Sequence, residues 1–303
     1  MPPADPIALM RRETRVRHGP VPRAVGDIEV GLDNYALSNS EFLFRTDAEL
    51  AYFYRKGEGV TIERGPGASE EDERLFLNGS VYAAVASING FYPIHASAVA
   101  AHSQVFAFNG PSGAGKSTLI AALGRHGLPM FCDDTLILQI PPRGPALGLP
   151  GHKRLKLLPD AIVMAGVERQ EKVASMIDKF FARPAAGIVE TMLPVAELVV
   201  LEEGPAGSDP VIEPVLGGRR LQMLQDDHYT QELFLGAHRP DLATRFAQLA
   251  RLAGAMRVSR FVRPRDPARF DEGVQLVADY VRARGAQDAQ NAVASATGEV
   301  KRA

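Results

Sequence analysis

Residues 110–118 read Gly110-Pro111-Ser112-Gly113-Ala114-Gly115-Lys116-Ser117-Thr118. Two glycines five positions apart, followed by lysine and then serine or threonine, are typical of loops that bind phosphate groups. Glycine lets the backbone curl around an anion and direct several N–H groups at it. The Lys116 ammonium is expected to reach the β- and γ-phosphates, and the Ser117 hydroxyl to bind Mg²⁺. The stretch therefore predicts a site for a nucleoside triphosphate and its metal ion.

The sequence on either side of this loop supports the prediction. The apolar run 105–108 suits a buried strand, and apolar residues after the loop recur at helical spacing as far as Gly127, which can end a helix. The positive end of such a helix points at the phosphates. Strand, glycine loop and helix are the arrangement expected of a phosphate-binding loop, whereas the alternative is an ordinary glycine turn before a helix.

Composition limits the classes of function. The chain has 303 residues, of which 46% are hydrophobic, and a net charge of −2, so bulk charge gives no case for a nucleic-acid partner. A single cysteine, Cys132, excludes an internal disulfide and fits a reducing compartment. No apolar run approaches the roughly 18 residues of a membrane helix, and the first residues lack an apolar signal core. We therefore expect a cytoplasmic protein that has no membrane or nucleic-acid partner.

The sequence predicts four segments. Residues 1–26 are rich in proline and arginine and are expected to form a loosely ordered arm. Residues 27–90 predict a small β-rich N-terminal region that closes with a helix over 75–88. Residues 91–284 predict an α/β catalytic domain that contains the loop, and residues 285–303, small and polar, a disordered tail.

Within the α/β domain, hydrophobic periodicity and turn residues give the expected elements. Strands are expected over 94–100, 105–109, 128–132, 136–140, 198–201 and 256–262, a proline- and glycine-rich loop over 141–151, and helices over 218–235, 241–253 and 267–284.

Two adjacent carboxylates follow the apolar run 128–132, namely Asp133 and Asp134. A strand that leaves the core delivers its first polar residues at the carboxyl edge of the sheet, where open α/β sheets bind ligands. One carboxylate could accept a proton from an attacking hydroxyl, and the other could hold Mg²⁺ directly or through water. The alternative is a pair of aspartates that simply begins a turn.

Other polar residues have less specific contexts. His95 lies between apolar residues, where a histidine is commonly a satisfied core residue, although it precedes the loop strand. Lys153, Arg154 and Lys156 place three cations in a glycine-containing segment that could contact phosphates, since phosphoryl transfer needs cations around the moving group. A solvated basic loop is the alternative.

A second basic segment, Arg263-Pro264-Arg265-Asp266, precedes the last expected helix. We interpret it as structural, because Asp266 can cap that helix and Pro267 suits its first position.

Three motifs occur in a fixed order, namely His-Ala-Ser-Ala-Val at 95–99, the glycine loop at 110–118 and Cys-Asp-Asp at 132–134. This order resembles the HPr kinase/phosphorylase family and its smaller HPr-kinase-like relatives, some of which are peptide kinases in lasso-peptide gene clusters. The resemblance is dense over 92–135 and diffuse to about residue 283, where it includes the late basic segment. It implies an α/β fold with a PEP-carboxykinase-like P-loop core.

The resemblance also implies an activity. Such a chain would transfer the γ-phosphoryl group of ATP, with Mg²⁺, to a serine-type hydroxyl of a peptide or small protein, and a lasso-peptide precursor is the most specific expectation. Asp134 would act as base toward the acceptor, Asp133 would support it and bind metal, and His95 would lie near the transferred phosphoryl. Members of the HPr branch form hexamers, so a homo-oligomer is a further expectation.

Two positions depart from HPr kinase proper. Ala96 follows His95 where that enzyme has an acidic residue, and Thr118 ends the loop where it has glutamate. These departures weaken the expectation of a reverse, phosphorylase reaction and of HPr as the substrate. Two other functions stay open at this stage, namely a kinase for a small metabolite alcohol and a nucleotide-binding regulator that transfers nothing.

Overall fold

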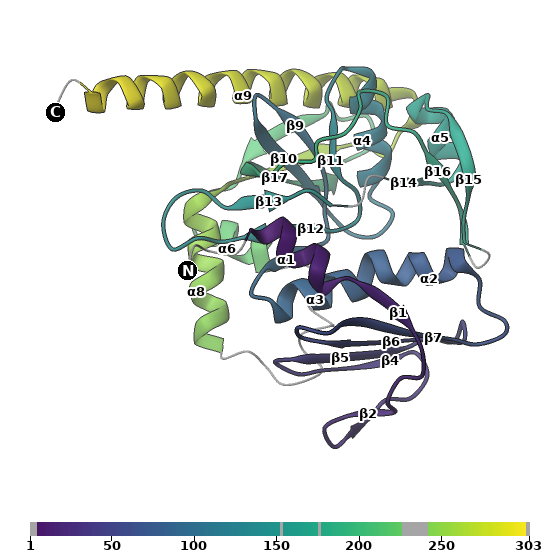
Figure 1. Cartoon of the computed structure of the whole chain (residues 1–303). Coiled ribbons are helices and arrows are strands. Elements are labelled where there is room, and N and C mark those ends of the chain that lie inside the picture. Colours follow the sequence, from purple (N-terminus) through teal and green to yellow (C-terminus); the bar gives the residue numbers. More distant parts are fainter. Residues whose placement is uncertain (1–4, 152–153, 175–176, 226–241, 301–303) are drawn as a thin grey trace.

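The computed structural model describes residues 5–151, 154–174, 177–225 and 242–300 (Figure 1). The fold is mixed α/β, with both parallel and antiparallel strand pairs. The helix predicted over 218–235 begins as α6 (Gly218–Gln225), and its remainder lies outside the described residues.

A small β-rich N-terminal region is present, as predicted. Its five-stranded sheet has the order β1 (Val16–His18), β7 (Gly59–Arg64), β6 (Leu50–Arg55), β5 (Glu41–Arg45) and β4 (Asn34–Leu37). A short hairpin precedes it, formed by β2 (Ala24–Val25) and β3 (Ile28–Glu29). Between this sheet and the rest of the molecule lie α1 (Pro6–Glu13), α2 (Glu70–Phe76), the π-helical turn η1 (Leu77–Val81) and α3 (Tyr82–Ile88) (Figure 1).

The loosely ordered arm predicted for residues 1–26 is wrong for most of its length. Helix α1 buries Met10 in the N-terminal core, and β1 pairs in parallel with β7. The buried carboxylate of Glu13 accepts hydrogen bonds from the Tyr54 hydroxyl (2.8 Å) and the Gly57 N–H (2.7 Å). The arm is ordered because its few apolar and acidic residues find partners about forty positions away, which composition alone does not reveal.

A second sheet carries the site. In the described part of the chain its strands have the order β11 (Met130–Cys132), β9 (Ser97–Ala101), β10 (Gln104–Asn109), β17 (Leu193–Glu203), β13 (Leu147–Leu149), β12 (Leu136–Gln139) and β8 (Tyr92–Ile94). Strand β17 also pairs with β19 (Arg257–Arg263), and β19 pairs with β18 (Val211–Pro214). Strand β17 is parallel to both β10 and β19, so these three strands present their carboxyl ends at one edge. Most of the predicted strands are thus present, and β13 lies within the predicted loop 141–151.

Strand β10 is buried on both faces, which holds the base of the loop in place. Phe106 and Phe108 pack in one core with α4 (Lys116–Arg125) and α9 (Phe270–Val300), whereas Val105 and Ala107 pack in another with α6 and α8 (Leu242–Ala255). Side chains alternate between faces along a strand, so one short apolar run serves both cores. Full burial of a phenylalanine contributes about 1.5–3 kcal/mol.

A third, three-stranded sheet lies beside α4, where the sequence predicted no element. It consists of β14 (Leu155–Leu157), β16 (Ile177–Ala182) and β15 (Arg169–Ala174), and α5 (Pro159–Ala165) connects β14 to β15. These strands are short and carry many charged residues among a few apolar ones, so their sequence gives only a weak indication of strand.

Helix α9 runs from Phe270 to Val300, so the disordered tail predicted from residue 285 is also wrong. Gly285 does not end the helix but allows close packing, because a Cβ there would lie 2.8 Å from Cδ2 of His102. One turn later Asp288 pairs with the Arg257 guanidinium at 2.6 Å. No helix in the described ranges has the length and apolarity needed to cross a membrane.

Candidate active site

The loop at 110–115 joins β10 to α4 and turns sharply at glycines. Gly113 and Gly115 have φ angles of 80° and 84°, in the left-handed region that favours glycine. A Cβ on Gly115 would also lie 2.9 Å from Nη2 of Arg263. The strand and helix predicted on either side of the loop are both present, and at Gly115 two independent constraints require glycine.

The Lys116 side chain lies along the loop. It is buried, with 6% of its surface exposed, and its ammonium donates to the carbonyl oxygens of Gly110 (2.9 Å) and Pro111 (3.3 Å). Its charge adds to the positive end of α4, which begins at this residue. The loop therefore concentrates positive potential where an anion can approach it.

Asp133 faces the first turn of α4 and is 6% exposed. Its Oδ1 accepts hydrogen bonds from the hydroxyls of Ser97 (2.7 Å) and Ser117 (2.8 Å), and its Oδ2 accepts one from the Lys156 N–H (3.2 Å). These bonds fix the carboxylate against the hydroxyl that the loop motif assigns to metal binding. This positioning role of Ser97 was not predicted from the sequence.

The Ser117 hydroxyl and the Asp133 carboxylate fit a magnesium ion. Both are hard oxygen donors, and they lie within 2.8 Å of each other. Among the residues that the structure describes, no group of three or more His, Cys, Asp or Glu side chains could form a metal cage. Magnesium suits such a sparse donor set, because it usually keeps waters and takes further oxygens from substrate phosphates.

Asp134 is the next residue, and its backbone adopts a left-handed conformation with φ 72°. Its carboxylate is 30% exposed, with Oδ1 3.5 Å from Nδ1 of His95 and Oδ2 3.4 Å from Nζ of Lys156. Burial acts to raise the pKa of Asp134, but the charge of Lys156, the electrostatic contribution of His95 and the hydrogen bond from Lys156 outweigh burial and hold this pKa below the usual value. The carboxylate is therefore ionised at neutral pH and accessible to a ligand.

Of the three cations predicted as phosphate contacts, the structure describes two, and these two have different partners. Lys156, on β14, reaches Asp134. Arg154 lies elsewhere, with its guanidinium carbon 3.6 Å from the centre of the Phe181 ring and in an ion pair with Glu171. Lys153 lies outside the described residues.

The end of β19 supplies residues that the sequence analysis interpreted as structural. Arg263 donates to the Ala114 carbonyl at 2.8 Å, and Arg265 lies 3.4 Å from the Gly113 carbonyl. Asp266 caps the following turn through the Ala268 N–H, as predicted. Arg263 ends β19 and Arg265 lies just beyond it, and β19 ends at the same edge as β10, so the carboxyl-edge rule that selected the aspartate pair also applied to them.

Comparison with known proteins adds a distant likeness. No protein-family model and no curated protein matches this chain. Among solved structures, the chain is similar to the HPr(Ser) kinase/phosphatase from Coxiella burnetii, with 14% sequence identity and a TM-score of 0.36 over 68% of this chain and 97% of that one. A likeness this distant does not define a function, which must come from the geometry of the site.

Proposed function

We propose that this chain is an ATP- and Mg²⁺-dependent kinase that transfers the γ-phosphoryl group to a serine-type hydroxyl of a peptide or small protein. One observation carries the proposal, namely the pairing of Ser117 with Asp133 directly beside the ionised, accessible carboxylate of Asp134. Nucleotide binding alone needs the loop and a metal ligand. A second carboxylate held beside them by a lysine and a histidine suits a reaction with a hydroxyl.

The donor side of the site neutralises charge and positions groups. When bound, Mg-ATP supplies the phosphoryl group, whose bond to the ADP oxygen breaks as its bond to the acceptor oxygen forms. The backbone N–H groups of the loop and the Lys116 ammonium bind the phosphate oxygens. Ser117 and Asp133 would hold the metal ion, and the buried Ser97 hydroxyl keeps Asp133 in position.

The acceptor side depends on Asp134. Its carboxylate orients the acceptor hydroxyl by accepting its hydrogen bond, and it receives the proton as the new O–P bond forms. A carboxylate with a lowered pKa is a weak base, which suits a loose transition state where orientation matters more than early proton removal. His95 and Lys156 fix this carboxylate and place positive charge near the transferred group.

The identity of the acceptor rests on the three motifs in order. Their resemblance to HPr-kinase-like proteins supports a peptide or small protein with an acceptor serine, and a lasso-peptide precursor is the acceptor that we propose to test first. A small metabolite alcohol and a regulator without transfer are the competing functions.

The test mixes the protein with Mg²⁺, γ-labelled ATP and a panel of serine-containing precursor peptides, small proteins and small alcohols. We expect label on a serine of a peptide or protein. Asp134→Asn should reduce transfer by about 10²-fold or more, with ATP affinity nearly unchanged, whereas Asp279→Asn, on the exposed face of α9, should transfer normally.

The competing functions give different results. Label found only on small alcohols would replace the peptide acceptor by a metabolite, and ATP binding without transfer to any acceptor would support a regulator. Full transfer by Asp134→Asn would remove this carboxylate from the chemistry.

A further inference from the structure

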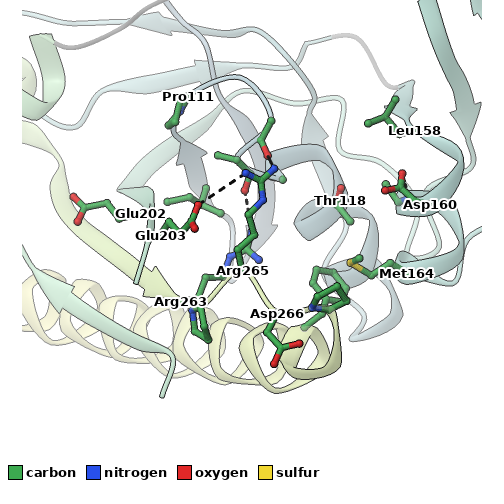
Figure 2. A pocket seen from close by; sticks show the side chains of 18 of the residues that line it. Pro111, Thr118, Leu158, Asp160, Met164, Glu202, Glu203, Arg263, Arg265 and Asp266 are labelled. Atoms are coloured by element: carbon green, nitrogen blue, oxygen red, sulfur yellow. Dashed lines mark hydrogen bonds and ion pairs between the residues drawn. The ribbon is translucent and has the colours of Figure 1, made fainter. Parts of the chain in front are cut away.

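The acceptor must approach Asp134, and the structure limits the side from which it can do so. The neighbouring Asp133 faces the glycine loop through its bond to Ser117, so the nucleotide occupies that side. A cavity of about 480 Å³ lies further along the loop, beside α5 and the carboxyl ends of β17 and β19 (Figure 2), but neither Asp134 nor His95 lines it. The Asp134 carboxylate, which is 30% exposed, instead contacts Lys156 of the third sheet. An acceptor that reaches Asp134 therefore also meets this sheet.

Strand β16 brings a further lysine to the same face of the third sheet. Phe181 on β16 lies directly opposite Lys156 on β14, so these two side chains share a face. Lys179 lies two residues before Phe181 and belongs to that face as well, because side chains alternate along a strand. Phe180, between them, points to the other face and packs against the core that contains α4 and α5. Lys179 is thus an exposed cation on the face that carries Lys156.

The charge of Lys179 acts on the acceptor side of the site. Burial raises the pKa of Asp134, Lys156 and His95 lower it, and Lys179 lowers it further. Since an electrostatic effect fades with distance and with exposure to water, the Lys179 ammonium lies near this carboxylate. The direct contacts of the carboxylate are nevertheless made by Lys156 and His95, and within the described ranges no carboxylate forms an ion pair with Lys179. Its charge is available to a ligand.

We propose that Lys179 selects acceptors that carry acidic residues beside the acceptor serine. The inference rests on the proposed function and adds a charge preference for the acceptor to it. A peptide whose serine hydroxyl lies at Asp134 places its next residues over the third sheet, since an extended chain advances only about 3.3 Å per residue. Acidic side chains there gain an ion pair with Lys179, whereas basic ones are repelled by Lys179 and Lys156.

The experiment uses three synthetic peptides that differ only in charge. Each has one serine in an alanine and glycine background, with glutamate, glutamine or lysine on both sides of the serine. Fluorescence anisotropy measures their dissociation constants in the presence of Mg-ADP, which fills the glycine loop, and γ-labelled ATP measures transfer separately. We expect the parent protein to bind the glutamate peptide about fivefold more tightly than the glutamine peptide, and the lysine peptide least well. The preference should shrink in about 0.5 M salt.

Three variants assign the preference to one side chain. Lys179→Gln should bind the glutamate and glutamine peptides alike, with its affinity for the glutamine peptide unchanged. Lys179→Glu should reverse the order, so that the lysine peptide binds best. Lys172→Gln is the matched control, because Lys172 is an exposed lysine of the neighbouring strand β15 that lies opposite Phe180 and so belongs to the other face. This control should keep the preference of the parent.

The outcomes separate this inference from the proposed function. Equal affinity of the parent for the glutamate and glutamine peptides would overturn the inference, as would a preference that persists in Lys179→Gln. Weaker ATP binding by Lys179→Gln with an unchanged peptide preference would also overturn it, since this lysine would then contact phosphate. Transfer to serine without any charge preference would leave the proposed function standing alone. Charge-selective binding without transfer to any acceptor would support the role of Lys179 and overturn the proposed kinase.

Discussion

Replacing Gly115 by alanine tests whether Arg263 and the glycine loop 110–115 form one unit. The substitution lowers the free energy of unfolding in two ways, which the structure lets us separate. The first is backbone strain, because φ at this position is 84°, and a residue with a Cβ in the left-handed conformation costs about 1–2 kcal/mol. The second is displacement of Arg263, whose Nη2 lies 2.9 Å from the position of the new Cβ.

The second cost follows from the bond that would be lost. The Arg263 guanidinium is the flexible end of a long side chain, so it can swing away, but it then gives up its 2.8 Å hydrogen bond to Ala114. A hydrogen bond to a charged group contributes about 1.5–3 kcal/mol. Because the freed guanidinium regains water, we take the lower end of that range, which gives a total of about 3 kcal/mol.

Two other glycines serve as controls. Gly113, in the same loop, and Gly144, between β12 and β13, have φ angles of 80° and 90°, and a Cβ on either would meet no atom within 4 Å. Their alanine variants should lose only about 1–2 kcal/mol of stability, which is the cost of backbone strain alone. Equilibrium urea unfolding measures the three free energies, and thermal unfolding should show a drop in Tm of about 5 °C for Gly115→Ala, because the unfolding entropy is about 2.1 cal/mol/K per residue. Equal destabilisation of all three variants would refute the coupling of Arg263 to the loop.

Two further predictions concern charges. Lys156→Met removes the cation that contributes most to lowering the pKa of Asp134 while burial remains, so this pKa should rise. A carboxyl with a lowered pKa stays ionised until the pH falls through that pKa. The acid limb of the pH–rate profile for phosphoryl transfer should therefore move to higher pH in Lys156→Met and stay in place in Lys156→Arg. If the acid limb stays in place in both variants, Asp134 does not determine it. Arg257 bridges the fully buried Glu197 and Asp288 of α9. Arg257 is 39% exposed, and Glu197 keeps hydrogen bonds from Ser259 and Tyr280, so Arg257→Met should cost about 1–3 kcal/mol of stability. Hydrogen exchange should become faster in α9 beyond Gly285. Arg251→Met, on the exposed face of α8, is the control, and equal exchange in both variants would contradict the bridge.

The sequence predicted the centre of the site because its signals are local. The glycine loop, the apolar strand before it and the aspartate pair after the next strand each occupy a few consecutive residues. An apolar strand must be buried in the sheet, and a phosphate needs backbone N–H groups beside it, so these short patterns allow few other placements of the loop and the aspartates. The roles of Ser97 and Arg263 depend on Asp133 and Ala114, which lie 36 and 149 positions away, so no local pattern indicates these roles.

The errors at both ends of the chain have the same cause. Polar composition predicted a loose arm and a disordered tail, yet α1 is held by Glu13 and α9 by Asp288, each through partners distant in sequence. At Gly285 the local rule pointed to a helix end, whereas the glycine is required by the nearby His102 ring. Tertiary contacts override local propensity wherever they bury enough surface.

The position of β17 between β10 and β19 has a consequence for the tolerance of this fold to change. The loop follows β10, Arg263 ends β19 and Arg265 lies two residues beyond it, and both strands pair in parallel with the same central strand. The spacing between the two halves of the site is thus set by backbone ladders and not by the segment that connects β17 to β19. Insertions at the exposed turn around Gly207, between β17 and β18, should leave the spacing intact, so the protein offers a place for an added recognition module.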